Sequence, residues 1–272
     1  MARSTLQRVV KGAAAAADVV RPPRRGLVVL LYHRVGRRTA SEVDLPIDLF
    51  DAQLDALAAT GRVAPLDVCL DAIASPEPTE PTDPIAITFD DGTADFVDLA
   101  LPRLERHGLP VTLYVATAFV EEGRPFPGDG APASWGALRD AQSTGLVVVG
   151  SHTHNHALLD RVPAQEAEHE LDRSRQLIEQ RLNTVPAHFA YPKAVAGSAA
   201  ADAAVRARFR SAALAGTRPN PYGRTDPYRL ARSPIQRADG MSWFRRKLDG
   251  GMGLEDRLRT LANRRRYAGV TT

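Results

Sequence analysis

Short apolar runs rich in β-branched residues alternate along this chain with amphipathic helical stretches, and this alternation restricts the fold more than any other feature. Four runs have the composition of buried strands, at 27–31, 85–89, 111–115 and 146–149. Three weaker runs lie at 187–190, 211–214 and 230–235. Because strands that alternate with helices usually pair in parallel, we expect an α/β fold, either a barrel or a doubly wound sheet.

The helical stretches carry their own start and stop signals. The first is expected between Asp48 as its N-cap and Gly61 as its stop. The single cysteine, Cys69, lies on a helix-like apolar face and is interpreted as a core residue, since a free cysteine packs as a small apolar side chain. Further helices are expected at 95–107, 134–144, 163–182, 241–248 and 254–266.

Positive charge is concentrated at the two ends of the chain. Residues 1–25 carry a formal charge of +5 and residues 254–272 carry +3, which leaves −5 for residues 26–253. This pattern argues against a nucleic-acid-binding protein, which needs basic residues on its folded face. We predict a basic N-terminal segment (1–25), one domain (26–253), and a basic C-terminal helix and tail (254–272). We interpret both ends as solvated, with contact to an anionic membrane surface as the alternative.

The start of the chain has some features of a secretion signal. Arg3, Arg8 and Lys11 precede an alanine-rich run at 12–17, but Asp18 interrupts that run. The longest apolar runs fall far below the ~18 residues that a membrane-spanning helix needs. We therefore expect a cytoplasmic or membrane-peripheral location rather than secretion.

Polar side chains directly follow several of the expected strands. In α/β sheets and barrels, catalytic and binding residues gather at the C-terminal ends of the strands. The residues in these positions should therefore open on one side of the sheet, and they lie at 32–34, 90–92, 151–156 and 192–193.

Two of these segments together predict a metal site. Asp90 and Asp91 are adjacent carboxylates, so one can hold a cation while the other stays free as a base; the alternative is a β-turn with Gly92. His152 and His156 lie four residues apart, which suits two imidazoles on one metal, although two hydrogen-bonded structural histidines would look the same. One carboxylate and two imidazoles leave coordination positions open, as in catalytic rather than structural sites.

These residues resemble the motifs of the polysaccharide deacetylase family, also described as NodB-homology domains or carbohydrate esterase family 4. The segments 88–92 (TFDDG) and 152–156 (HTHNH) are similar to its first two motifs, and 189–193 (FAYPK) and 226–232 (DPYRLAR) to later ones. The resemblance implies a single-domain distorted (β/α) barrel and metal-dependent deacetylation of an N-acetylated sugar. It also implies that Asp91, His152 and His156 hold the metal and that Asp90 is the general base.

The chain departs from the family pattern at two places. Ala190 stands where the third motif often has an arginine that orients the base, and Arg232 is the candidate substitute. The late histidine that usually serves as general acid is absent, because no histidine follows His188. The segment 31–33 (LYH) has that pattern instead, as in the permuted branch typified by exopolysaccharide deacetylases. This makes His33 the expected general acid, and a buried structural histidine is the alternative.

The resemblance also gives expectations for ligands. The cation should be divalent, Zn²⁺ first, with Co²⁺ or Ni²⁺ as alternatives. Tyr32, Tyr191 and Pro192 are candidates for contact with the sugar ring, whereas Trp135 is better explained by packing. The expected substrate is an N-acetylated polysaccharide, oligosaccharide or glycoconjugate. Hydrolysis of another non-peptide C–N bond and a catalytically silent sugar-binding protein are the alternatives.

Overall fold

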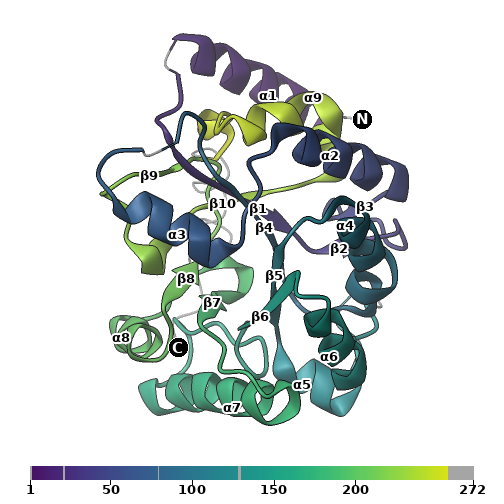
Figure 1. Ribbon diagram of the computed structural model, residues 1–272, viewed down its shortest axis with the longest axis vertical. Helices are drawn as coiled ribbons and strands as arrows, with labels where there is room; N and C mark the ends of the chain where they lie inside the picture. The colour runs from purple at the N-terminus through teal and green to yellow at the C-terminus, as the bar shows by residue number, and fades with distance from the viewer. Residues whose placement is uncertain (1, 21, 79, 128–129, 257–272) are drawn as a thin grey trace.

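The computed structural model describes residues 2–20, 22–78, 80–127 and 130–256, and it shows helices arranged around a curved sheet (Figure 1). All seven strand runs expected from the sequence are present within two residues of their expected limits. The strands are β1 Gly26–Tyr32, β2 Arg34–Val35, β3 Asp44–Leu45, β4 Ile85–Phe89, β5 Val111–Val115, β6 Val147–Ser151, β7 His188–Ala190, β8 Ser211–Ala213, β9 Asn220–Pro221 and β10 Arg232–Pro234.

The helices cover the outside of this sheet and close one end of it (Figure 1). They are α1 Ala2–Val20, α2 Ile47–Thr60, α3 Leu66–Ala74, α4 Leu101–His107, α5 Thr117–Glu122, α6 Trp135–Ser143, α7 Ala164–Leu182, α8 Ala199–Arg208 and α9 Gly240–Leu248. A π-helical turn, η1 Phe96–Ala100, leads into α4, and short 3₁₀ turns lie at η2 Pro192–Ala194, η3 Pro227–Arg229 and η4 Arg237–Asp239. None of the helices in this described part of the chain is long and apolar enough to cross a membrane.

The main sheet has the strand order β10-β1-β4-β5-β6-β7-β8, and neighbours on this path pair in parallel, while β9 adds to β1 in the antiparallel direction. The sheet curls until its two ends meet. Ala213 at the end of β8 bridges to Leu230, and the Gly216 N–H donates to the carbonyl of Arg232 at 2.7 Å. The predicted distorted (β/α) barrel is thereby confirmed.

Alternation along the strands separates an inner and an outer core. Leu27 and Val29 of β1 point into the barrel with Ala86 of β4, whereas Val28 and Leu30 pack outward against the surrounding helices. Helix α3 closes the inner cluster, and its Cys69 is fully buried there as predicted. The same alternation carries Asp90 to the inner face, because it lies four residues after Ala86.

The helix limits differ from the sequence prediction in a few places. Helix α2 begins after Pro46, so Asp48 lies in its first turn and is not its N-cap, whereas Gly61 ends the helix with φ 62° as expected. Helix α8 was not predicted, since its alanine-rich sequence has no clear apolar periodicity, but Ser198 caps it through the Ala201 N–H. Of the helix expected at 254–266, residues 254–256 are helical and the rest, like the tail to residue 272, lies outside the described residues.

The interpretation of the N-terminal segment as solvated is wrong for one face of α1. Lys11 is 2% exposed, and its ammonium group lies 2.5 Å from Asp239 and 2.7 Å from Glu255. Ala14 and Ala15 are buried on the same side against Met252. The alanine run that resembles part of a secretion signal thus packs against the end of the folded domain.

Asp239 carries the contact between α1 and α9. Lys247 is also 2% exposed and lies 2.7 Å from the second carboxylate oxygen of Asp239, so one carboxylate receives two buried ammonium groups. Burial alone would raise the pKa of Asp239, but Lys247 and Lys11 lower it, and the carboxylate is ionised at neutral pH.

We expect the substitution Asp239→Asn to lower the free energy of unfolding by about 3 kcal/mol, because it leaves the buried Lys247 ammonium without its ion-pair partner and leaves Lys11 with Glu255 alone. Chemical denaturation at neutral pH measures the loss. The folded-state pKa of Asp239 lies below its ordinary value of 3.8, so its contribution is present above that pH and lost as the pH falls below it. The control is Asp249→Asn, whose carboxylate is 78% exposed and should change stability by less than about 0.5 kcal/mol. Equal stabilities of the two variants would contradict this account.

Candidate metal centre

Two strand ends bring the predicted metal ligands together. Asp90 and Asp91 follow β4, His152 follows β6, and the strand between them, β5, joins the two loops. The Ala116 N–H after β5 donates to the carbonyl of Asp91 at 3.0 Å, and the His152 N–H donates to the carbonyl of Val115 at 2.9 Å. The backbone of β5 therefore fixes the distance between the aspartate pair and the first histidine.

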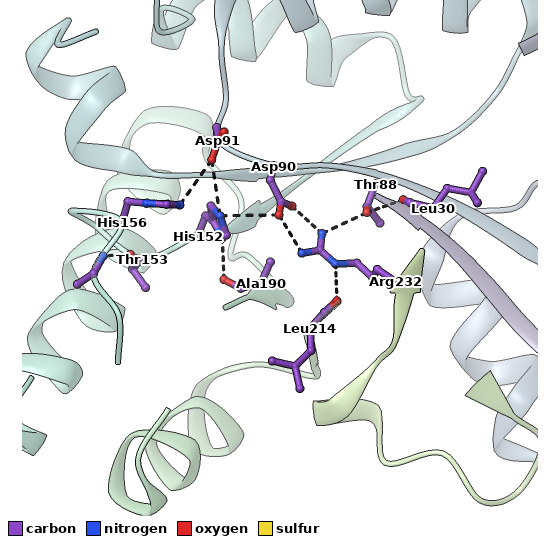
Figure 2. Close-up of polar contacts among 11 residues, drawn as sticks. Leu30, Thr88, Asp90, Asp91, His152, Thr153, His156, Ala190, Leu214 and Arg232 are labelled. Atoms are coloured by element: carbon purple, nitrogen blue, oxygen red, sulfur yellow. Dashed lines mark hydrogen bonds and ion pairs between the residues drawn. The ribbon is translucent and has the colours of Figure 1, made fainter. Parts of the chain in front are cut away.

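Asp91, His152 and His156 form one cluster, shown in Figure 2. The Asp91 Oδ1 atom lies 3.7 Å from Nε2 of His152 and 3.6 Å from Nε2 of His156. Three ligand atoms at ~2.0–2.2 Å from a tetrahedral Zn²⁺ would lie about 3.4 Å apart, close to these distances. The three side chains therefore fit a single divalent cation, and His156 and Asp91 are the more exposed members of the set.

The histidines are in the protonation state that a metal ligand requires. Nδ1 of His152 lies 2.7 Å from the carbonyl oxygen of Ala190, which can only accept a hydrogen bond. Nδ1 therefore carries the proton, and the lone pair is on Nε2, the nitrogen on the side of Asp91. Burial lowers the pKa of His152, and burial together with the neighbouring His152 lowers the pKa of His156 to about 4. Both imidazoles are therefore neutral at pH 7, with Nε2 of His152 free to coordinate.

The loop between the two histidines is held in an unusual backbone conformation. Thr153 and His156 in this loop have φ angles of 64° and 58°, and Asp91 in the loop after β4 has 78°. All three lie in the left-handed region that non-glycine residues seldom occupy. Glu170 of α7 holds this loop, because its two oxygens accept 2.7 Å hydrogen bonds from the backbone and the side-chain amide of Asn155. Thr153 contributes by accepting a hydrogen bond from the Ala157 N–H at 3.1 Å.

Asp90 is held beside this cluster by a buried arginine (Figure 2). The Arg232 guanidinium is fully buried and donates to both carboxylate oxygens of Asp90, at 2.6 and 2.9 Å. It also donates to the Thr88 hydroxyl and the Leu214 carbonyl, each at 3.2 Å. Burial would raise the pKa of Asp90, but Arg232 and, to a smaller degree, His152 and His33 lower it to about 2. Asp90 is therefore an oriented, ionised carboxylate at neutral pH.

His33 reaches the same end of the barrel from β1. Tyr32 pairs with Phe89, and the Asp90 N–H donates to the Tyr32 carbonyl at 3.1 Å, so His33 and Asp90 follow adjacent strand ends. Its Nδ1 atom is buried and has no hydrogen-bond partner among the residues that the structure describes. This nitrogen is available to a group that enters the site.

The predicted sugar contacts are wrong for the two tyrosines. Tyr32 is fully buried, its hydroxyl bonds Gln53 at 3.1 Å, and its ring stacks on Phe89. Tyr191 is also fully buried, with its hydroxyl donating to Asp202 at 2.7 Å. Pro192 is buried beside it. Tyr32 packs in the cluster between the sheet and its helices, and Tyr191 packs in a separate buried cluster with Phe189.

Sequence reasoning missed three residues that shape the site. Glu170 is buried on α7, and its spacing of three residues from Ala167 and four from Ser174 places it on the buried face, a signal that could have found it. Thr88 accepts from Arg232 and donates to the Leu30 carbonyl at 2.7 Å, a role that its place in TFDDG could have suggested. Tyr114 lies under the guanidinium, with the Arg232 Cζ 5.1 Å from its ring centre. A strand tyrosine gives no such signal.

Comparisons with known proteins agree with this geometry. The family model described as polysaccharide deacetylase matches residues 77–212, half of the chain. A comparison with curated proteins found no match.

Two solved structures share the fold along most of the chain. The deacetylase PplD from Streptococcus pyogenes, solved with acetate, is 20% identical with a TM-score of 0.72, and the match covers 83% of this chain and 99% of that one. IcaB from Ammonifex degensii is 25% identical with a TM-score of 0.70, covering 82% of this chain and 98% of that one.

Removing one histidine of the cluster should abolish tight metal binding. For His156→Ala we expect the Zn²⁺ affinity of metal-stripped protein to fall by at least about 100-fold, because losing a ligand costs more than losing its outer partners. Isothermal titration calorimetry measures the affinity. The matched control is His107→Ala on α4, whose imidazole lies 3.4 Å from Asp55 on the surface. Zn²⁺ affinities that fall equally in both variants would contradict the assignment.

Proposed function

The chain belongs to the polysaccharide deacetylase family, and we propose that it hydrolyses the acetamido group of an N-acetylated saccharide with the help of a divalent metal ion. One observation carries the proposal. Asp91, His152 and His156 converge within 4.8 Å of one another, directly beside a second carboxylate, Asp90, that a buried arginine orients. A ligand set with open positions next to an ionised base is the arrangement of catalytic rather than structural metal sites.

The proposed ligands are Asp91, His152 and His156, and Zn²⁺ is the expected ion, with Co²⁺ or Ni²⁺ as alternatives. A divalent ion bound there would supply Lewis acidity, which polarises the acetamide carbonyl and lowers the pKa of a coordinated water towards ~7. The hydrogen bond from His152 to Ala190 supports this assignment, because it leaves Nε2 without a proton.

Asp90 is the proposed general base. Arg232 donates a hydrogen bond to one lone pair on each carboxylate oxygen of Asp90. The other lone pair of each oxygen remains free to accept a proton from water. A carboxylate with a pKa of about 2 is a weak base, so it needs a water made acidic by its surroundings. As Asp90 takes the proton, the water oxygen bonds to the carbonyl carbon.

His33 is the proposed general acid. Its position on the strand end beside Asp90 supports the role, as does the Nδ1 atom that lacks a partner within the described residues. A protonated His33 would give its proton to the sugar nitrogen as the C–N bond breaks, so that an amine leaves rather than an amide anion. The products are acetic acid, which ionises to acetate in water, and the free amino sugar. Asp90 then releases the proton taken from water to solvent, and His33 takes up a proton from solvent, so both residues return to their starting states.

The test is acetate release from N-acetylglucosamine oligosaccharides. We expect release by the wild-type protein to stop with a chelator and to return when Zn²⁺, Co²⁺ or Ni²⁺ is added. The variant Asp90→Asn should still bind Zn²⁺ but release acetate ~10²–10⁴-fold more slowly, because the proposed base is removed while the three metal ligands remain. Asp98→Asn, an exposed change on η1, is the control with unchanged release. Chelator-resistant release, or full activity of Asp90→Asn, would overturn the proposal.

The role of His33 is tested by changing the leaving group. We expect His33→Ala to lose ~10²–10⁴-fold in acetate release from the amide substrate. Its loss on 4-nitrophenyl acetate should be much smaller, because a nitrophenolate leaves without a proton. Parallel initial-rate measurements on the two substrates give the comparison. Equal losses on both would assign His33 a structural role instead.

A further inference from the structure

A cavity lies at the opposite end of the barrel from the metal centre. It has a volume of about 620 Å³ and is lined by the end of α1, by residues 22–24, by residues 218–221 and 224–226 around β9, by Arg229, and by four residues between 250 and 256. Strand β1 starts beside it, where Gly26 pairs with Pro221, and ends beside Asp90. Seven residues of strand separate the two ends by about 20 Å, so this cavity is not part of the deacetylase site.

The walls of this cavity are stiff. Pro22, Pro23, Pro219 and Pro221 line it, and each proline has a fixed φ angle. Gly250 is pressed against this wall, since a Cβ atom there would lie 2.4 Å from Pro219 Cγ. A cavity of this size with fixed walls loses little conformational entropy when a small ligand binds.

The charges that line the cavity are unbalanced. The Asp18 carboxylate accepts a hydrogen bond from the Met252 N–H, and Asp226 is paired with Arg206 at 2.6 Å. Asp256 also has a partner.

Three of the four arginines that line the cavity have no ion-pair partner among the described residues. Arg229 pairs with Asp202 at 3.0 Å, but Arg24, Arg218 and Arg224 line the cavity without an ion pair or a side-chain hydrogen bond to any described residue. Three exposed arginines therefore line one concave space, and of the carboxylates beside them Asp226 is already neutralised by Arg206.

We propose that this cavity is a binding site for a phosphate-bearing ligand. Guanidinium groups present planar pairs of N–H donors that match phosphate oxygens, and a concave wall of low polarity strengthens the field of unpaired cations. A phosphate group has three terminal oxygens and close to two negative charges, so it can engage several arginines at once. A carboxylate offers two oxygens and one charge, and it satisfies three arginines less well.

The test uses pyrophosphate as the probe. We expect saturable binding by isothermal titration calorimetry to the full-length protein, weakened at least about tenfold in the variant Arg218→Gln/Arg224→Gln. The matched control is Arg106→Gln/Arg245→Gln, which removes two exposed arginines from α4 and α9, outside the cavity lining. Circular dichroism and Zn²⁺ titration check that both variants are folded.

The same phosphate chemistry could come from a soluble compound or from a lipid headgroup, and a second measurement separates the two. Cosedimentation with phosphatidylcholine vesicles, with and without phosphatidic acid, is compared for the wild type and both variants. Phosphatidic-acid-dependent binding that only the cavity variant loses identifies a membrane headgroup. Binding of pyrophosphate alone identifies a soluble ligand.

Absence of both kinds of binding, or equal weakening in the cavity variant and its control, would overturn the inference. Acetate release serves as the separate readout, because neither variant touches the metal centre. If the cavity variant loses pyrophosphate binding but still releases acetate, the result bears on this cavity alone. If the wild-type protein releases no acetate, the result bears on the proposed deacetylase function alone.

Discussion

The ionisation and orientation of Asp90, beside the candidate metal ligands, depend on one buried ion pair with Arg232. A carboxylate that is 4% exposed would tend to take up a proton, and a neutral Asp90 could not accept one from water. Arg232 prevents this from the far side of β1, since it sits on β10 and reaches across to the end of β4. The closure of the barrel between β8 and β10 therefore has a chemical consequence, because it places the Arg232 cation beside the Asp90 carboxylate.

Two neutral imidazoles lie beside that ion pair. Burial lowers the pKa of both His152 and His156, so each can offer a nitrogen lone pair to a cation. The strained loop that presents His156 is fixed from outside by Glu170, which lets the ligands keep their positions before any ion arrives. Preorganisation of this kind reduces the rearrangement needed on binding.

Much of this arrangement could be predicted from the sequence, because the strands are short apolar runs and their polar ends are conspicuous. Asp91, His152 and His156 were predicted to converge, and they do. The errors have a common physical origin. Tyr32 and Tyr191 sit next to the site in sequence, but side-chain alternation and packing bury them, and burial depends on strands that are distant in the chain. The buried face of α1 was missed for the same reason, since its partner lies at the other end of the chain.

The buried contact of Lys11 also bears on how the protein is made. Its partner Asp239 follows 228 residues later, and at ~5–20 residues per second a ribosome needs about 10–50 s to synthesise that stretch. During this time α1 has been synthesised, but the Asp239 carboxylate that pairs with its Lys11 side chain has not. This contact between α1 and Asp239 can therefore form only late in synthesis of the domain.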